Sequence, residues 1–474
     1  LHLAKTWLKD CITTHSICQN HGHASTFRPL RLIDVQQDDP NTIRLDTTTS
    51  DEHLQYVALS YCWGGDQLGK TLRANLDTRT EGFSLSDSPA TIRDAVSVTR
   101  QLGVRFIWID SLCIVQDDDD DKNIEITRMH DIYQHAAVTL SAARATSSQQ
   151  GFLNVCSPPL LMEPIHSRAW TMQEHVLSRR LLIFGTFGVR WTCSAGRQLD
   201  NTQENGNQIN NLIAEFLLGP NSKTQYGEST ITPDTWRDTV SNYSVRALTN
   251  PEDQLLAISA IATLHAAARP RDRYLAGLWA DSVAKGLLWN VRSVEKSSRS
   301  QDPQFPSWSW ASVRAAVFFA ATLSSAEERV TMRLVSYDII LSNKTVPLGH
   351  VIRGSLDIEG NLFVIRGAQP DLRFRSDTIL LGACEAFDEH VVPFHASLDL
   401  LTPLDSLVGL VCLELISTLD DFSNSYGLIL CAEAGSTVSF SRVGIFTRFP
   451  GPLSDRNPAW KERPSATRKL VRLL

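Results

Sequence analysis

The segment Tyr56-Val-Ala-Leu-Ser-Tyr-Cys-Trp-Gly-Gly-Asp66 joins a short apolar run to a loop that contains two glycines. Residues 57–59 are apolar without alternation, which is typical of a strand covered on both faces of a sheet. The pair of glycines allows the backbone to turn sharply or to approach a ligand closely. The carboxyl end of this strand carries four candidate ligand-binding residues: Ser60, Tyr61, Trp63 and Gly64. An ordinary core strand ending in a Gly-Gly turn is the alternative interpretation.

Two more apolar runs follow, at 104–109 and 137–140, and helical patterns separate the three predicted strands. A strand-helix-strand order implies a right-handed parallel crossover. The alternation therefore predicts an α/β domain with a parallel, flavodoxin-like sheet. Because ligands bind at the carboxyl ends of strands in such sheets, we expect Ser60 and Asp110 to lie at the same edge.

The chain has 474 residues, which is enough for two or three domains. We expect residues 1–50 to be an extension packed on the core, residues 51–195 to form the α/β domain, and residues 196–235 to be a polar linker. Helical patterns indicate a helical segment at 236–300. Alternation with period two and frequent turn residues predict a β-rich carboxyl-terminal domain at 301–474.

The composition excludes several classes of protein. A net charge of -7 and a pI near 6.0 argue against a nucleic-acid-binding protein, which would normally present a basic face. No window approaches about 18 consecutive apolar residues, so we expect no membrane span. The first residues lack the layout of a secretion signal, and nine cysteines, an odd number, are typical of reduced thiols. We therefore expect a cytoplasmic protein.

A group of potential zinc ligands lies near the amino terminus: Cys11, His15, Cys18, His21 and His23. Zinc binds four such groups tetrahedrally, but the spacing here fits no common zinc finger. The first three residues fall near helical spacing, and the others follow irregularly. A helix with chance cysteines is the stronger interpretation, so we expect no metal site.

Four motifs occur in the first 200 residues: Tyr56-x-Ala-Leu-Ser-Tyr-x-Trp-Gly64, Pro89-x-Thr-Ile-x-Asp-Ala-Val96, Trp108-Ile-Asp-Ser-Leu-Cys-Ile-Val-Gln-Asp117 and Arg168-x-Trp-x-x-Gln-Glu174. Three more occur later: Leu248-Thr-x-Pro-Glu-Asp253, Tyr274-Leu-Ala-Gly-Leu-Trp279 and Pro306-Ser-Trp-Ser-Trp-Ala311. Together they resemble the HET (heterokaryon incompatibility) domain family of filamentous fungi. Members of that family are associated with non-self recognition and with a cell-death reaction after incompatible fusion.

A second similarity is to TIR domains. The strand end at 59–66 looks like their first strand and loop, and Trp170 and Glu174 repeat their tryptophan-to-glutamate spacing of four. In TIR enzymes that glutamate serves in cleaving NAD at the nicotinamide ribosyl bond, so the similarity implies a catalytic Glu174. A carboxylate could stabilise the oxocarbenium-like centre that forms there. The alternative is a glutamate in the first turn of a helix that interacts with the helix dipole.

Three further residues have both a ligand-binding and a structural interpretation. Asp110, the second catalytic candidate, could hold a ribose hydroxyl or cap a helix. Arg168 could bind a phosphate or pair with Glu174. Trp170 could stack on a base or a nicotinamide ring, or anchor the core. We expect no required cofactor, with NAD as a candidate substrate.

We therefore predict a cytoplasmic HET protein with a nucleotide-like or small-molecule ligand at the strand ends and NAD cleavage as its candidate activity. One rival is a non-catalytic death effector that self-associates or binds a partner incompatibility protein. Aromatic residues exposed near Trp63 would favour that rival. Another is an enzyme recruited to fungal secondary metabolism, which a large apolar cavity between the two halves would favour.

Overall fold

The computed structural model describes most of the chain, in two compact units: unit 1, Leu1–Thr230, and unit 2, Ile231–Leu474. The described residues are 1–19, 27–48, 54–67, 69–153, 162–199, 223–224, 227–228, 233–294, 297–300, 305–319, 328–342, 347–364, 384–385, 391–392, 394–400, 410–418, 425–448 and 468–474. Within these ranges no helix is both long enough and apolar enough to cross a membrane. The predicted polar linker falls mostly outside them.

Four parallel strands form the centre of unit 1: β3 (Tyr56–Ser60), β5 (Phe106–Trp108), β6 (Val138–Ser141) and β7 (Arg180–Gly185). Their order across the sheet is β5-β3-β6-β7, and every residue of β3 is buried. Ala58 pairs with Trp108 on one side of β3, and Ser60 pairs with Ser141 on the other. The predicted parallel neighbours are confirmed, and Ser60 and Asp110 lie at the same edge of the sheet.

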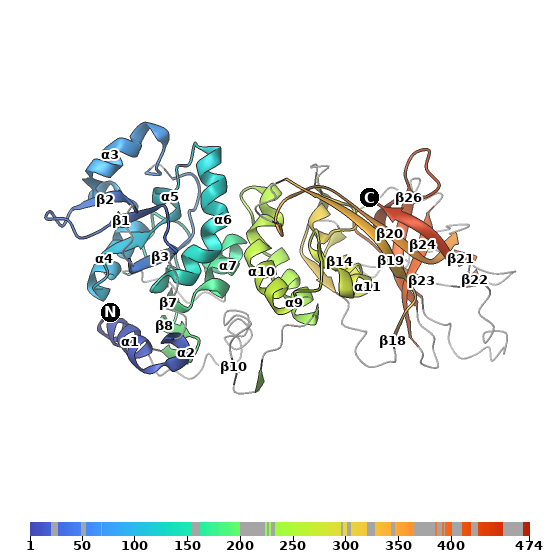
Figure 1. Ribbon diagram of the computed structural model, residues 1–474, viewed down its shortest axis with the longest axis horizontal. Helices are drawn as coiled ribbons and strands as arrows, with labels where there is room; N and C mark the ends of the chain where they lie inside the picture. The colour runs from blue at the N-terminus through green and yellow to red at the C-terminus, as the bar shows by residue number, and fades with distance from the viewer. Residues whose placement is uncertain are drawn as a thin grey trace. The chain divides into compact units, whose positions relative to one another are not determined.

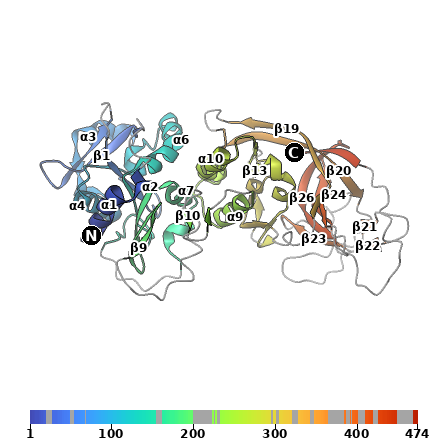
Figure 2. The ribbon, with the colours of Figure 1, turned by 60° about the horizontal axis from the view of Figure 1, so that its bottom comes forward.

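Three helices connect these strands: α4 (Ala90–Leu102), α6 (Asp119–His135) and α7 (Trp170–Leu177). α4 lies on one side of the central strands, and α6 and α7 lie on the other (Figure 1, Figure 2). The strand order matches the first four strands of flavodoxin-like sheets, whose ligand site lies where the connections change direction. In unit 1 that point lies between the carboxyl ends of β3 and β6.

The whole sheet of unit 1 is mixed, which corrects the expectation of a parallel sheet. Its nine strands run in the order β4-β2-β1-β5-β3-β6-β7-β8-β9, and the outer pairs on both flanks are antiparallel. Short connections such as the one between β1 and β2 cannot make a parallel crossover, so those strands pair antiparallel. Residues before position 51 thus extend the sheet itself. The additional elements of unit 1 are α1 (His2–Thr14), α2 (Ser16–Gln19), β1 (Arg31–Asp34), β2 (Thr42–Thr47), α3 (Leu76–Glu81), β4 (Phe83–Ser84), α5 (Asp110–Cys113), β8 (Gly188–Cys193), β9 (Gly196–Leu199), β10 (Lys223–Thr224) and β11 (Gly227–Glu228).

Unit 2 begins with helices α9 (Pro233–Ser244) and α10 (Ser259–Ala268). The prediction of a helical segment at 236–300 is wrong beyond α10. A hairpin of β12 (Tyr274–Leu275) and β13 (Leu278–Trp279) follows that helix. Its two turn residues, Ala276 and Gly277, have φ values of 44° and 100°, as tight two-residue hairpins require. The next elements are α11 (Val283–Gly286), β14 (Trp289–Val291), β15 (Ser298–Arg299), β16 (Val313–Arg314) and β17 (Val317–Phe319).

The tryptophan-rich motifs of unit 2 meet in its core. The indole N–H groups of Trp236 and Trp310 both donate to the Gly277 carbonyl, at 2.9 and 2.8 Å. Trp289 donates in the same way to the Trp308 carbonyl at 2.9 Å. A Cβ at Gly277 would lie 2.5 Å from Nε1 of Trp310, so only glycine fits there. These motifs are explained by packing.

A β-rich region completes unit 2, as predicted. Strand β20 (Val351–Val364) pairs with β27 (Arg468–Leu473) and with β24 (Val411–Thr418). With β25 (Ser425–Ala432) and β26 (Ser439–Arg448), the pairings close into a ring, the arrangement of a barrel. The other described strands are β18 (Glu328–Val330), β19 (Arg333–Leu341), β21 (Cys384–Glu385), β22 (Val391–Val392) and β23 (Phe394–Leu398).

Candidate functional site

Hydrogen bonds join the segments that follow β3 and β5. The indole N–H of Trp63 donates to Oδ2 of Asp110 at 2.9 Å, and the backbone N–H of Ser111 donates to Oδ1 at 2.6 Å. The hydroxyl of Tyr61 donates to Oγ of Ser111 at 2.8 Å. Burial raises the pKa of Asp110 above its usual value, although Arg168 and Trp63 favour the ionised form. The structure thus brings together three of the predicted site residues.

Gly64 is required by the packing of its loop. Its φ is +74°, and a Cβ there would lie 2.1 Å from Cβ of Ser147. The preceding Trp63 carbonyl accepts hydrogen bonds from the backbone N–H of Ser148 at 3.1 Å and from the Gln67 amide at 2.8 Å. The two loops therefore fix the position of the Trp63 backbone. A role of Gly64 in ligand binding stays a prediction.

Glu174, on α7, has a buried carboxyl near the carboxyl end of β3, and 3% of the residue is exposed. Burial raises its pKa to about 7. The charge of Arg168 and the nearby hydroxyls of Ser60 and Tyr133 lower this pKa, while the nearby Asp110 carboxylate raises it further. A carboxyl with a near-neutral pKa can donate or accept a proton at physiological pH.

The positive charge of Arg168 influences both carboxyls. Its guanidinium donates to the Tyr61 carbonyl, and its positive charge lowers the pKa of both Asp110 and Glu174. We call Asp110, Arg168 and Glu174 the acid–arginine cluster. The cluster contains one guanidinium and two carboxyls, so it has excess negative charge when both acids are ionised. That excess favours protonation of one acid.

Two predicted tryptophans belong to the segments that form this region, and one contributing residue was missed from the sequence. Trp63 and Trp170 are both half-buried. Trp170 begins α7, and its four-residue spacing from Glu174 places both on one helix face. Tyr133, which the sequence analysis did not select, comes from α6 and donates to the Leu59 carbonyl at 3.1 Å. Its apolar helical spacing indicates burial but not a carboxyl partner.

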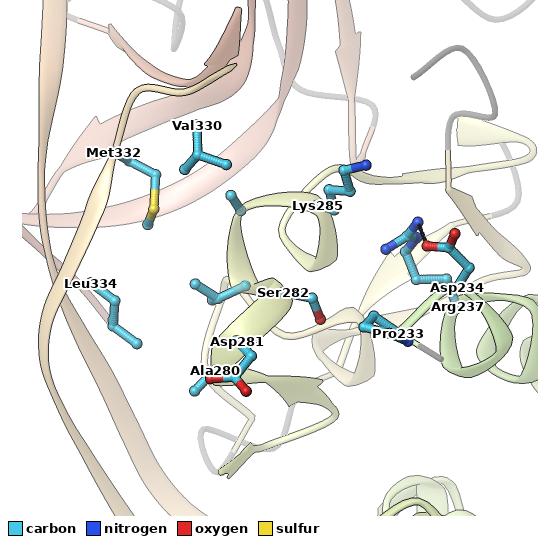
Figure 3. Close-up of a pocket in the computed structure, with 12 residues that line it drawn as sticks. Pro233, Asp234, Arg237, Ala280, Asp281, Ser282, Lys285, Val330, Met332 and Leu334 are labelled. Atoms are coloured by element: carbon cyan, nitrogen blue, oxygen red, sulfur yellow. Dashed lines mark hydrogen bonds and ion pairs between the residues drawn. The ribbon is translucent and has the colours of Figure 1, made fainter. Parts of the chain in front are cut away.

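A separate pocket lies within unit 2 and has a volume of about 370 Å³. It is bordered by the start of α9, by residues 280–285 and by residues 330–334 (Figure 3). Arg237 in its wall forms an ion pair with Asp234. The pocket shares no residue with the acid–arginine cluster.

A comparison with known protein families gives a match to the region that begins with β3. Residues 56–161 match the family model described as heterokaryon incompatibility protein (HET). The chain contains a HET domain. The match supports a protein of the heterokaryon incompatibility type. The matched region of the HET domain includes five predicted site residues: Ser60, Tyr61, Trp63, Gly64 and Asp110.

Three other predicted site residues lie beyond the matched region: Arg168, Trp170 and Glu174. The chain has no significant match among curated proteins or among solved structures. The similarity of the HET domain to TIR domains therefore stays a prediction. The acid–arginine cluster therefore combines Asp110, which is inside the matched region, with Arg168 and Glu174, which follow it.

Proposed function

We propose that the HET domain binds a nucleotide-like ligand at the carboxyl ends of the central strands β5, β3 and β6 and hydrolyses NAD there. The observation that carries the proposal is the buried Glu174 carboxyl, whose pKa is raised to about 7 beside Arg168 and Asp110. Strongly shifted carboxyls with a specific charged partner occur preferentially at functional sites. The strand ends near this carboxyl are also where open α/β sheets bind ligands.

In the proposed reaction the bond between C1′ of the ribose and the nicotinamide ring nitrogen breaks. The electron pair of that bond passes to the ring nitrogen and neutralises its positive charge, so cationic character develops at C1′. The Glu174 carboxylate stabilises this centre. The oxygen of a water molecule then bonds to C1′, and its proton passes to Glu174 and on to solvent. The products are nicotinamide, ADP-ribose and one proton.

The other residues of the region would position the ligand. Both carboxylate oxygens of Asp110 accept a hydrogen bond already, at 2.9 and 2.6 Å, and each keeps a second lone pair for a ribose hydroxyl. Arg168 supplies a positive charge for a phosphate. The half-buried rings of Trp63 and Trp170 offer surfaces for stacking.

The direct test is to incubate the purified protein with NAD and to measure nicotinamide release. Glu174→Gln keeps the size of the side chain and removes its charge, so we expect the rate to fall by about 100 to 1000-fold. Glu81→Gln, a change at an exposed position of α3, is the matched control and should leave the rate unchanged. Melting temperatures recorded in parallel separate loss of chemistry from loss of fold.

Two outcomes would contradict this proposal in different ways. If the wild-type protein releases no nicotinamide in either monomeric or oligomeric fractions, hydrolysis is rejected and a non-catalytic, self-associating effector is the better account. If wild type and Glu174→Gln release nicotinamide equally, the HET protein is a hydrolase, but Glu174 is not its catalytic group.

A further inference from the structure

Four side chains that can bind zinc meet at the edge of unit 1. Cys11 lies on α1, His15 directly follows that helix, and Cys18 lies on α2. The fourth, Cys193, is the last residue of β8, far away in the sequence. One ligand atom from each residue lies within 4.8 Å of the corresponding atoms of the other three.

The spacing of these atoms is close to that of a tetrahedral zinc site. With ordinary zinc bond lengths, two sulfur ligands lie about 3.8 Å apart and a sulfur and a nitrogen about 3.5 Å apart. The distance from Sγ of Cys193 to Nδ1 of His15 is 3.5 Å. No two ligand atoms in the group are more than 4.8 Å apart, which exceeds the ideal value by only roughly 1 Å.

The environment of the four ligands is that of a closed site. The exposed fractions of Cys11, Cys18 and Cys193 are 0%, 5% and 3%, and His15 is half-buried. All three cysteines are free of disulfide bonds. Three sulfurs and one nitrogen complete the coordination of zinc without water, which is typical of structural rather than catalytic sites.

An arginine beside the group provides independent support. Nε of Arg180 donates to Sγ of Cys11 at 3.1 Å, and Nη2 donates to the Cys18 carbonyl at 3.0 Å. Arg180 is also the partner of Cys193 in the pairing of β7 with β8. Zinc with three thiolates and one neutral imidazole has a net charge of about −1, so a guanidinium at this position offsets the charge and orients a ligand.

We propose that Cys11, His15, Cys18 and Cys193 bind one structural zinc ion. The ion would tie α1 and α2 to β8 and so anchor the amino-terminal residues to the sheet that carries the acid–arginine cluster. The proposal reverses the expectation of no metal, which rested on the spacing of the amino-terminal residues alone. His21 and His23, the other two candidates from the sequence, lie outside the described residues.

The test is elemental analysis of the full chain purified without chelators. We expect one equivalent of zinc in the wild type and a loss of bound zinc in Cys193→Ser. Two controls should keep one equivalent: Cys431→Ser, which changes a partly exposed cysteine of unit 2, and the double variant His21→Ala/His23→Ala. Arg180→Gln should keep the site but weaken zinc affinity about 10 to 100-fold in a chelator competition.

A second measurement covers the case in which Cys193→Ser does not fold. Cobalt exchanged into the wild type should give the intense visible bands of tetrahedral coordination and a thiolate charge-transfer band in the near ultraviolet. Removal of the metal should lower the melting temperature, and zinc but not magnesium should restore it. A wild-type protein that takes up neither zinc nor cobalt stoichiometrically would overturn the proposal, as would a folded Cys193→Ser that retains a full equivalent of zinc.

Discussion

Unit 1 and unit 2 each hold an arginine beside carboxyl groups, half-buried at Arg168 and fully buried at Arg442, and the two arrangements differ in how the charges are paired. In unit 2, Nε and Nη2 of Arg442 donate to the two oxygens of Asp399 at 2.9 and 3.0 Å. The same guanidinium donates to the carbonyls of Leu287 at 2.5 Å and Trp289 at 2.6 Å. It also lies 3.3 Å from the centre of the Trp289 ring. The Asp399 carboxylate is thus paired through both of its oxygens, and a second guanidinium, that of Arg299, lies 3.9 Å from it.

The acid–arginine cluster of the HET domain has the opposite balance, because two carboxyls lie under the influence of one guanidinium. Arg168 donates to a backbone carbonyl, that of Tyr61, and acts on Glu174 and Asp110 through its charge. Burial therefore dominates, and the pKa of Glu174 rises to about 7. A buried acid whose pKa lies near neutral pH lowers the stability of the fold when it ionises. Its proton is, however, available for chemistry.

The comparison shows that burial of a charged residue does not by itself indicate function. A bidentate pair whose remaining donors are satisfied by carbonyls, as at Arg442, has a structural explanation. A carboxyl that shares one guanidinium with a second carboxyl, as at Glu174, has a pKa that suits proton transfer. Two predictions test this distinction, and a third tests the packing of the loop that carries Trp63 and Gly64.

The largest effect should follow from Arg442→Met in unit 2. The change leaves Asp399 buried without its bidentate partner, and Arg299 remains at 3.9 Å. Breaking a buried ion pair from one side typically costs about 3–5 kcal/mol, so we expect the free energy of unfolding of unit 2 to fall by about that amount. Denaturant titration followed by tryptophan fluorescence measures this loss.

The matched control for that change is Arg333→Ala. Arg333 pairs with Glu359 at 2.8 Å, but its side chain is 68% exposed. Exposed ion pairs contribute about 0–1 kcal/mol, so unit 2 should remain almost as stable as in the wild type. Similar losses for the two arginine variants would show that burial of the pair at Arg442 has no special importance.

The next effect concerns the pH dependence of stability through Glu174. Its pKa is raised from 4.5 to about 7 in the folded protein, so the native state binds this proton more tightly than the unfolded state. The stability from this proton is fully present below pH 4.5 and is lost as the pH rises through about 7. The total is about 3 kcal/mol. Glu174→Gln lacks this dependence.

Denaturant titrations of both proteins across this pH range test the assignment. The free energy of unfolding of the wild type should fall relative to that of Glu174→Gln as the pH rises. The rate of nicotinamide release by the wild type should rise as the pH rises, because the proposed chemistry requires the ionised carboxylate. Stability curves that stay parallel for the two proteins would argue that the pKa of Glu174 is not raised.

The smallest of the three effects should come from Gly64→Ala. The new Cβ would meet Ser147 at 2.1 Å, and φ is +74°, so we expect unit 1 to lose about 1–3 kcal/mol. Gly103→Ala is the control, because its φ is +80° but open space surrounds the added Cβ. That control should cost about 1 kcal/mol. Equal losses measured by thermal or denaturant unfolding would exclude the Ser147 contact as the cause.

Much of the parallel centre of unit 1 was predictable because its signals are local. The apolar run at 57–59 indicated a buried strand, and helical spacing between the runs indicated crossovers. The flanks were not predictable in the same way. Antiparallel pairing of β1 with β5 depends on which edge of the sheet is available. The β12–β13 hairpin was missed because its short strands give no periodic pattern.

The amino-acid sequence alone determined the strand ends that bear Ser60 and Asp110, the HET match, and three of the four proposed zinc ligands. Only the tertiary structure brought Cys193 to the other three and Tyr133 to Glu174. The raised pKa of Glu174 is also a tertiary property, since it depends on burial and on groups distant in the chain. Periodicity reports which face of an element is buried, whereas a ligand set or a pKa depends on which residues meet there.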